Sequence, residues 1–186
     1  MALVLKVDAT DLGRMSRAFR DLSVEQRDRI LYRALNRAGD QAFTQVKRVL
    51  AKETGLKVGR VAPALKKRRA DLGRLRYEID ARGGHLKITG GNFGARQVAR
   101  GVSHRAWGRR QVAEGAFVPK GRSVAFKRVR RSRLPIENLW GPAIPREMVR
   151  GKSGEAIRGK VATVFIPRVL HETERSIARA KARYGL

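Results

Sequence analysis

The sequence predicts an α+β fold with a long N-terminal helix, antiparallel strands, an extended Pro-rich crossing and a C-terminal helix. Three observations support this prediction. Residues 24–54 repeat apolar side chains at helical spacing, and residues 75–129 contain short alternating segments separated by glycine-containing turns. Three prolines then occur between residues 134 and 146, where they oppose both helix and central strand.

Length and charge limit the classes of protein that the chain can belong to. Its 186 residues indicate a single domain, residues 1–186, and the 42% apolar fraction is enough for a packed core. Lys and Arg number 43 against 16 Asp and Glu, which gives a formal net charge of +27. Such a charge attracts polyanions, so nucleic acid is the first partner to expect. With no Cys, the chain has neither disulfides nor thiolate metal ligands.

The N-terminal residues alternate between apolar and charged side chains. Leu3, Leu5 and Val7 predict a short strand, and residues 12–22 form a short amphipathic piece. The segment lacks the continuous apolar stretch of a secretory signal, and the longest apolar runs are too short for a membrane span. We therefore expect a soluble protein that is not exported.

A long helix is predicted over residues 24–54. Ser23 and Gln26 have the spacing of a capping box, and Gly55 provides the stop. The apolar side chains recur every three or four residues at Leu31, Leu35, Ala38, Ala42, Val46 and Val49. The opposite face carries more cations than nearby acids can pair, at Arg27, Arg29, Arg33, Arg37, Lys47 and Arg48.

Positive charge concentrates after this helix. Residues 56–70 predict a shorter helical piece that is interrupted at Pro63 and ends in the basic run 66–69. Residues 56–133 hold 22 Lys or Arg against four acids, so they carry +18 of the total charge of +27. This middle part of the chain is therefore the expected place for polyanion contact.

The same middle part contains strand patterns. Residues 75–80 and 86–88 predict one hairpin across the Gly83-Gly84 turn, and residues 117–118 and 124–129 predict a second. Between them, residues 83–113 include a basic, partly irregular loop region whose order is expected to depend on a partner.

The C-terminal third begins with the Pro-rich crossing. Pro135, Pro142 and Pro145 predict an extended path. A helical pattern follows over residues 147–166, and Pro167 is expected to open or kink a final helix. That helix has a narrow stripe of less polar side chains at Val169 or Leu170, Thr173, Ile177 and Ala180.

Sequence motifs do not favour an enzyme. Gly151-Lys152-Ser153 resembles the end of a phosphate-binding loop, but Arg146 stands where its first glycine is required. His171-Glu172 resembles the start of a zinc-binding helix, yet Arg175 occupies the closing position and cannot bind a metal. We expect no catalytic residue, no metal site and no cofactor.

The basic runs are the strongest candidate site. A run of cations usually forms a solvated surface, but +27 far exceeds what solubility requires. Arg predominates, which favours bidentate contact with phosphate, and no base-reading motif accompanies it. The DNA-facing candidates are Lys66, Lys67, Arg68, Arg69, Lys127, Arg128, Arg130, Arg131 and Arg133.

A further set of motifs lies between residues 115 and 145. Gly115-Ala116-Phe117 precedes the second hairpin, then come Arg133-Leu134-Pro135-Ile136 and Gly141-Pro142-Ala143-Ile144-Pro145. Their order before a C-terminal helix resembles the minor tail protein Z family of tailed bacteriophages and prophages. Ala34-Leu35-Asn36-Arg37-Ala38 and Lys52-Glu53-Thr54-Gly55 are similar to that family's helix core and exit. The resemblance covers about three quarters of the chain.

The resemblance implies a tail-completion protein at the head-proximal end of the tail, joined to the head as an oligomeric ring around the DNA channel. It implies that the long helix packs on an antiparallel sheet. The implied partners are copies of itself, tail terminator, tail tube or head-neck connector proteins, and packaged DNA. The implied location is the virion, after assembly in the host cytoplasm. A cellular, sequence-nonspecific nucleic-acid-binding protein of ribosomal or nucleoid type stays open as the alternative.

The Pro-rich crossing is the expected contact with neighbouring subunits. DNA contact has no need of its apolar side chains, and prolines reduce the entropy lost when such a segment becomes ordered. The interface candidates are Leu134, Pro135, Ile136, Leu139, Trp140, Pro142, Ile144 and Pro145.

Overall fold

The computed structural model describes residues 2–5, 23–149 and 151–184, and it confirms the α+β fold. The predicted amphipathic piece at residues 12–22 lies outside the described residues. The described chain forms two compact units. The first unit contains the described parts of residues 47–65 and 81–155. The second unit contains the described parts of residues 2–46, 66–80 and 156–186. A single domain over residues 1–186 stays a prediction.

The long helix α2 (Val24–Thr54) begins and ends where its sequence signals predict. The Gln26 amide donates to the Ser23 hydroxyl at 3.3 Å, and the Ser23 amide donates to the Gln26 side chain at 3.1 Å. This reciprocal capping box satisfies two amides that the first helical turn leaves without a partner. At the other end, Gly55 adopts a left-handed conformation with φ of 77° and its amide donates to Ala51.

The second unit packs helices against a three-stranded sheet. Strands β1 (Ala2–Leu5), β2 (Leu65–Arg68) and β3 (Tyr77–Ala81) lie in the order β1-β3-β2, with β1 antiparallel to β3. The strand predicted at Leu3, Leu5 and Val7 is therefore confirmed over Ala2–Leu5, and Val7 lies outside the described residues. Gly39 of α2 lies against the buried ring of Tyr77 on β3, which places the long helix on the sheet as expected.

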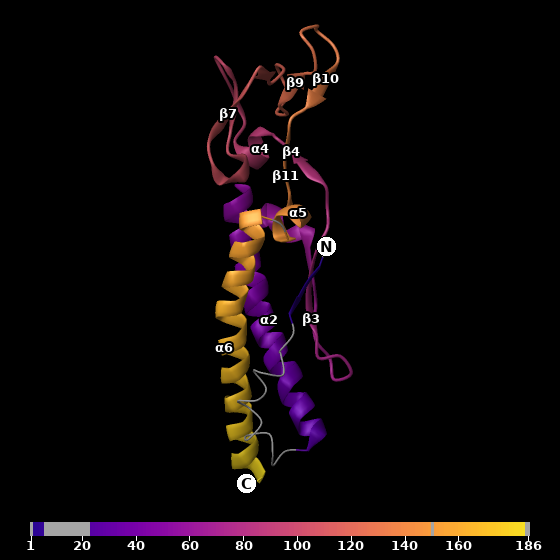
Figure 1. The fold of residues 1–186 in the computed structure, drawn as a ribbon, viewed down its shortest axis with the longest axis vertical. Helices are drawn as coiled ribbons and strands as arrows, with labels where there is room; N and C mark the ends of the chain where they lie inside the picture. Colours follow the sequence, from indigo (N-terminus) through magenta and orange to yellow (C-terminus); the bar gives the residue numbers. More distant parts are fainter. Residues whose placement is uncertain (1, 6–22, 150, 185–186) are drawn as a thin grey trace. The chain divides into compact units, whose positions relative to one another are not determined.

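Helix α6 (Gly151–Tyr184) lies antiparallel to α2 in this unit (Figure 1). It is continuous through Pro167, which was expected to open or kink a separate final helix. The predicted stripe packs inward, because Val169, Thr173 and Ile177 are buried. The Thr173 hydroxyl donates to the Val169 carbonyl one turn earlier, so this buried polar group is satisfied.

The first unit is built from short strands and helical turns. Its helical elements are α3 (Val58–Val61), η1 (Ala62–Ala64), α4 (Gly90–Phe93), η2 (Ala106–Gly108) and α5 (Ile144–Val149). Its strands are β4 (His85–Lys87), β5 (Arg96–Val98), β6 (Gly101–His104), β7 (Gln111–Glu114), β8 (Ala116–Phe117), β9 (Phe126–Arg128), β10 (Ile136–Asn138) and β11 (Trp140–Ala143). They form antiparallel sheets in the orders β5-β6-β7, β10-β9-β8 and β11-β4.

One strand pairing and one loop region were predicted wrongly. The expected hairpin between residues 75–80 and 86–88 does not form, since β3 pairs with β1 and β2 while β4 pairs with β11. Residues 83–113 are largely regular, with β6 fully buried as the central strand between β5 and β7. The second predicted hairpin is confirmed by the pairing of β8 with β9.

Two helix boundaries also differ from expectation. The predicted helical piece after Leu56 ends at Ala64, and residues 66–68 of the basic run belong to strand β2. Helix α5 starts at Ile144 inside the predicted crossing, with Pro145 as its second residue. The first helical turn tolerates proline because its amides have no partner within the helix.

Candidate nucleic-acid interface

The β9–β10 hairpin presents the predicted basic run 127–133 to solvent. Lys127, Arg128, Arg130, Arg131 and Arg133 are all exposed. The Val129 amide donates to the Pro135 carbonyl at 3.2 Å, and the Ser132 hydroxyl donates to the Leu134 carbonyl at 2.6 Å. These bonds close the hairpin with its own backbone and hydroxyl groups, so they do not occupy its charged side chains.

The positive charge of this hairpin is almost uncompensated. No Lys or Arg of residues 127–133 makes an ion pair with another described residue. The Arg128 guanidinium lies 5.3 Å from the centre of the Phe117 ring and donates to the Arg133 carbonyl at 3.0 Å. Arg128 therefore packs on β8 and bonds within the hairpin, while Arg130, Arg131 and Arg133 offer donors to an external anion.

The other predicted run, residues 66–69, is largely neutralised within the protein. Asp40 of α2 accepts hydrogen bonds from Lys67 at 2.5 Å and from Arg69 at 2.7 Å. Arg68 lies 3.7 Å from Asp80 and 3.9 Å from the buried Glu78. Lys67 and Arg69 thus tie this segment to α2, whereas Arg68 pairs with acids of β3 within the sheet.

Asp40 keeps its negative charge in this cluster. Burial alone would raise its pKa, but hydrogen bonds from Lys67 and Tyr77, together with the charges of Lys67 and Arg69, outweigh burial and lower the pKa. The Tyr77 hydroxyl donates to Asp40 at 2.9 Å. Burial and the neighbouring carboxylate raise the pKa of Tyr77 far above its usual range, so the hydroxyl remains a donor.

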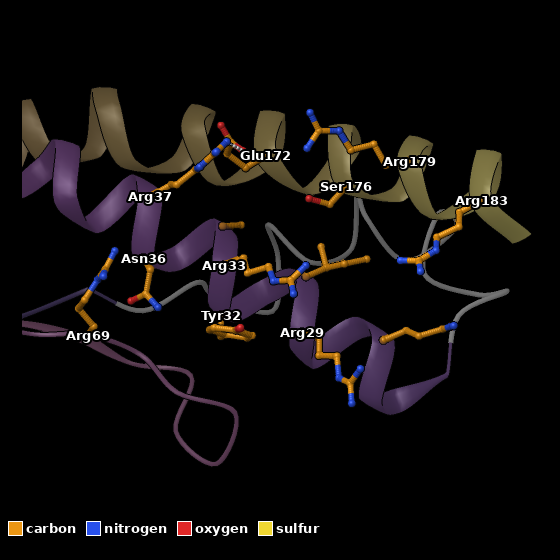
Figure 2. Close-up of a pocket in the computed structure, with 13 residues that line it drawn as sticks. Arg29, Tyr32, Arg33, Asn36, Arg37, Arg69, Glu172, Ser176, Arg179 and Arg183 are labelled. Atoms are coloured by element: carbon orange, nitrogen blue, oxygen red, sulfur yellow. Dashed lines mark hydrogen bonds and ion pairs between the residues drawn. The ribbon is translucent and has the colours of Figure 1, made fainter.

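A groove of about 720 Å³ between α2 and α6 gathers a second set of cations (Figure 2). Six arginines line it, namely Arg29, Arg33, Arg37, Arg69, Arg179 and Arg183. All six are exposed, and we call this surface the arginine groove. Sequence reasoning did not place it among the candidate sites. The sequence pattern that indicates the groove is the four-residue spacing of arginines on the polar face of α2. That spacing does not identify α6 as the helix that forms the other side.

Glu172 is the one acid in the lining of the arginine groove, and it is buried. It accepts from Arg37 at 2.6 Å and lies 2.7 Å from Arg168. Burial would raise its pKa, but the hydrogen bond from Arg37 and the charges of Arg168, Arg37 and Arg175 lower it. Glu172 is thus committed to structural pairing with Arg37 and Arg168, and it does not neutralise Arg29, Arg33 or Arg179.

The structure divides the predicted interface residues into two groups. Leu134, Ile136 and Trp140 are 67%, 38% and 49% exposed. Pro135 is exposed as well, and Leu139 and Pro145 are half-buried. Pro142 and Ile144 are instead buried in the core of the first unit, so they stabilise the subunit's own fold and are not available as a contact surface.

The two basic surfaces can bind phosphate without any metal or cofactor. Arginine presents paired donors that match two phosphate oxygens, and Tyr32 is the one aromatic side chain in the lining of the arginine groove. Among the described residues, no helix is long and apolar enough to cross a membrane.

No protein-family model matches the chain, and neither a curated protein nor a solved structure matches it with statistical significance.

Proposed function

We propose that this protein is a structural subunit at the head-proximal end of a bacteriophage tail. It completes the tail and joins it to the head-neck connector as an oligomeric ring around the DNA channel. The proposal draws its location from the sequence motifs between residues 115 and 145 that resemble minor tail protein Z. Its role is to line a DNA conduit with positive charge and to pack against neighbouring protein.

The observation that carries the proposal is the placement of two surfaces next to each other in one hairpin. The exposed basic run 127–133 continues directly into the exposed apolar side chains of Leu134 and Ile136. A ring subunit needs this combination, because phosphate on one side must be neutralised while like-charged neighbours are held together by apolar contact. Trp140 adds a large half-exposed ring to the same crossing.

The alternative function is sequence-nonspecific nucleic-acid binding in a cell, by a protein of ribosomal or nucleoid type. The arginine groove favours it, since the groove is formed by one chain and needs no neighbouring subunit. Both functions use contacts to phosphates, so DNA affinity alone does not separate them.

Localisation within particles separates the two functions. Virions produced by a prophage that encodes the chain are purified, and the protein is located by gold-labelled antibodies in electron micrographs. The proposed function predicts one labelled position, at the junction of head and tail, and ring-shaped oligomers of the purified protein. Absence from intact virions, together with a monomer that coats DNA, would support the cellular function instead.

A further inference from the structure

We propose that the arginine groove is a binding site for a phosphodiester backbone, separate from the β9–β10 hairpin. The two surfaces belong to different compact units, and the groove is formed within the second unit alone. The inference goes beyond the proposed function, because it applies wherever in the cell or virion the protein meets nucleic acid.

The arginines of the groove are regularly spaced along both helices. Arg29, Arg33 and Arg37 follow one another at four-residue intervals on α2, and Arg179 and Arg183 do so on α6 (Figure 2). Four residues advance an α-helix by about 6 Å, so each helix carries a row of cations at a constant step along its axis. A polymer with a phosphate in every residue can contact successive members of such a row.

Several of the positive charges in the groove are not balanced by an acid. Arg29, Arg33 and Arg179 make no ion pair with any described residue. Glu172 already pairs with Arg37 and with Arg168 outside the lining. Folding therefore holds several like charges around one groove, and an anion that enters it relieves their mutual repulsion.

The lining distinguishes a phosphodiester chain from an acidic protein segment. Protein interfaces centre on apolar or aromatic anchors that lose water on contact. Ile30 and Ala34, the aliphatic members of the lining, are only 8% and 1% exposed. Tyr32 is the one aromatic member; it is half-buried, and the Arg33 guanidinium lies 5.9 Å from the centre of its ring. Asn36 and Ser176 add polar groups to the arginines. A ligand with charge along its whole length and no apolar face fits this surface best.

Crosslinking tests where the nucleic acid lies. The chain has no Cys, so Ser176→Cys creates a unique attachment point for a photoreactive benzophenone in the lining of the groove. Gly84→Cys is the control, since Gly84 is exposed, has nothing within 4 Å of an added Cβ and lies in the other unit. With labelled duplex and single-stranded oligonucleotides, we expect crosslinks from position 176 well above those from position 84. Equal yields would overturn the proposal.

Salt dependence tests how many phosphates the groove binds. The variant Arg29→Gln/Arg33→Gln/Arg179→Gln removes three unpaired charges, and Lys57→Gln/Arg60→Gln/Lys120→Gln removes three exposed charges from the other unit. The slope of log affinity against log salt changes by about 0.9 for each duplex phosphate that is bound. We expect the groove variant to lower the slope by up to about 2.7, and the control to lower it much less. Equal slopes for the two variants would contradict a site in the groove.

Two further measurements keep the outcomes distinct. Melting temperatures of both triple variants establish that they fold, and poly-L-glutamate serves as a polyanion without phosphate. A groove variant that loses poly-L-glutamate binding but keeps its DNA affinity would indicate an acidic protein partner and overturn the proposal. Absence of the protein from virions would contradict the proposed function while leaving the crosslinking result unaffected.

Discussion

Arg37 on α2 donates to Glu172 on α6 at 2.6 Å, which joins two residues 135 positions apart in the sequence. The Glu172 side chain is buried while Arg37 remains largely exposed. Arg168 approaches the same carboxylate from one turn earlier on α6. This contact ties the two long helices together at the arginine groove and gives the first prediction.

Glu172→Gln should lower the free energy of unfolding by about 1.5–3 kcal/mol at neutral pH, because the variant has no charged acceptor for the Arg37 hydrogen bond and no partner charge for Arg168. The pKa of Glu172 is lower in the folded protein than its usual value of 4.5. Its ionised form therefore stabilises the fold fully above about pH 4.5, and that contribution disappears as the pH falls through the lower folded pKa. Urea unfolding from pH 7 to pH 2 should show a shallower acid loss for the variant. Parallel curves for both proteins would show that Glu172 is not linked to stability.

Gly39→Ala should destabilise the packing of α2 on its sheet. A Cβ at this position would lie 2.3 Å from Cδ2 of the Tyr77 ring, and Tyr77 is fully buried and bonded to Asp40. Overpacking of this kind costs about 1–3 kcal/mol. Gly59→Ala is the matched control, as nothing lies within 4 Å of its added Cβ. Thermal unfolding should show a lower melting temperature for Gly39→Ala only. Equal melting temperatures for the two variants would contradict the close approach of α2 to the Tyr77 ring.

Gly55→Ala should cost more stability than Gly121→Ala, although the two glycines have nearly the same φ of 77° and 78°. The left-handed conformation alone costs an L residue about 1–2 kcal/mol. At Gly55 the new Cβ would also lie 2.1 Å from the Arg105 carbonyl oxygen, whereas nothing lies near it at Gly121. Urea unfolding of both variants separates backbone strain from steric overlap. A larger loss at Gly121 would contradict the packing at the end of α2.

The exposed cations of the β9–β10 hairpin should bind part of the DNA backbone. Replacing Lys127, Arg130, Arg131 and Arg133 by Ser should weaken duplex binding at low salt, while Arg128, which packs on Phe117, is left in place. The salt slope should fall by up to about 0.9 for each phosphate that the variant no longer binds. Fluorescence anisotropy across a range of salt concentrations measures both quantities. Unchanged affinity and slope would remove this hairpin from the DNA interface.

Trp140→Ala and Ile144→Ala should separate assembly from folding. Trp140 is half exposed, so its truncation should reduce association by about 2 kcal/mol, as for a central aromatic anchor, with little effect on melting temperature. Ile144 is 3% exposed, and its truncation should cost about 2–5 kcal/mol of folding stability. Melting temperature and incorporation into tails are measured for both. A Trp140 variant that melts early yet incorporates normally would assign this side chain to the fold.

Local signals in the sequence were sufficient to predict the elements whose hydrogen bonds join residues close together in the chain. The capping box at Ser23 and the end of α2 at Gly55 depend on hydrogen bonds between residues three or four positions apart. Both ends of α2, and therefore its length, were predicted correctly. The turn between β8 and β9 also follows from adjacent residues. The exposure of run 127–133 could be predicted as well, since five cations so close together have no acid among them.

Strand partners and charge compensation were decided by the tertiary structure. An alternating segment such as β3 can pair with any complementary edge, and its partner β1 lies more than 70 residues away along the chain. Likewise, no local pattern assigns Asp40 to Lys67 and Arg69, or brings α6 beside the arginines of α2. The sequence alone determined where the cations are and which segments are helical. Only the folded chain decided which cations are neutralised, because Coulomb interactions depend on distances in space that residue spacing does not specify.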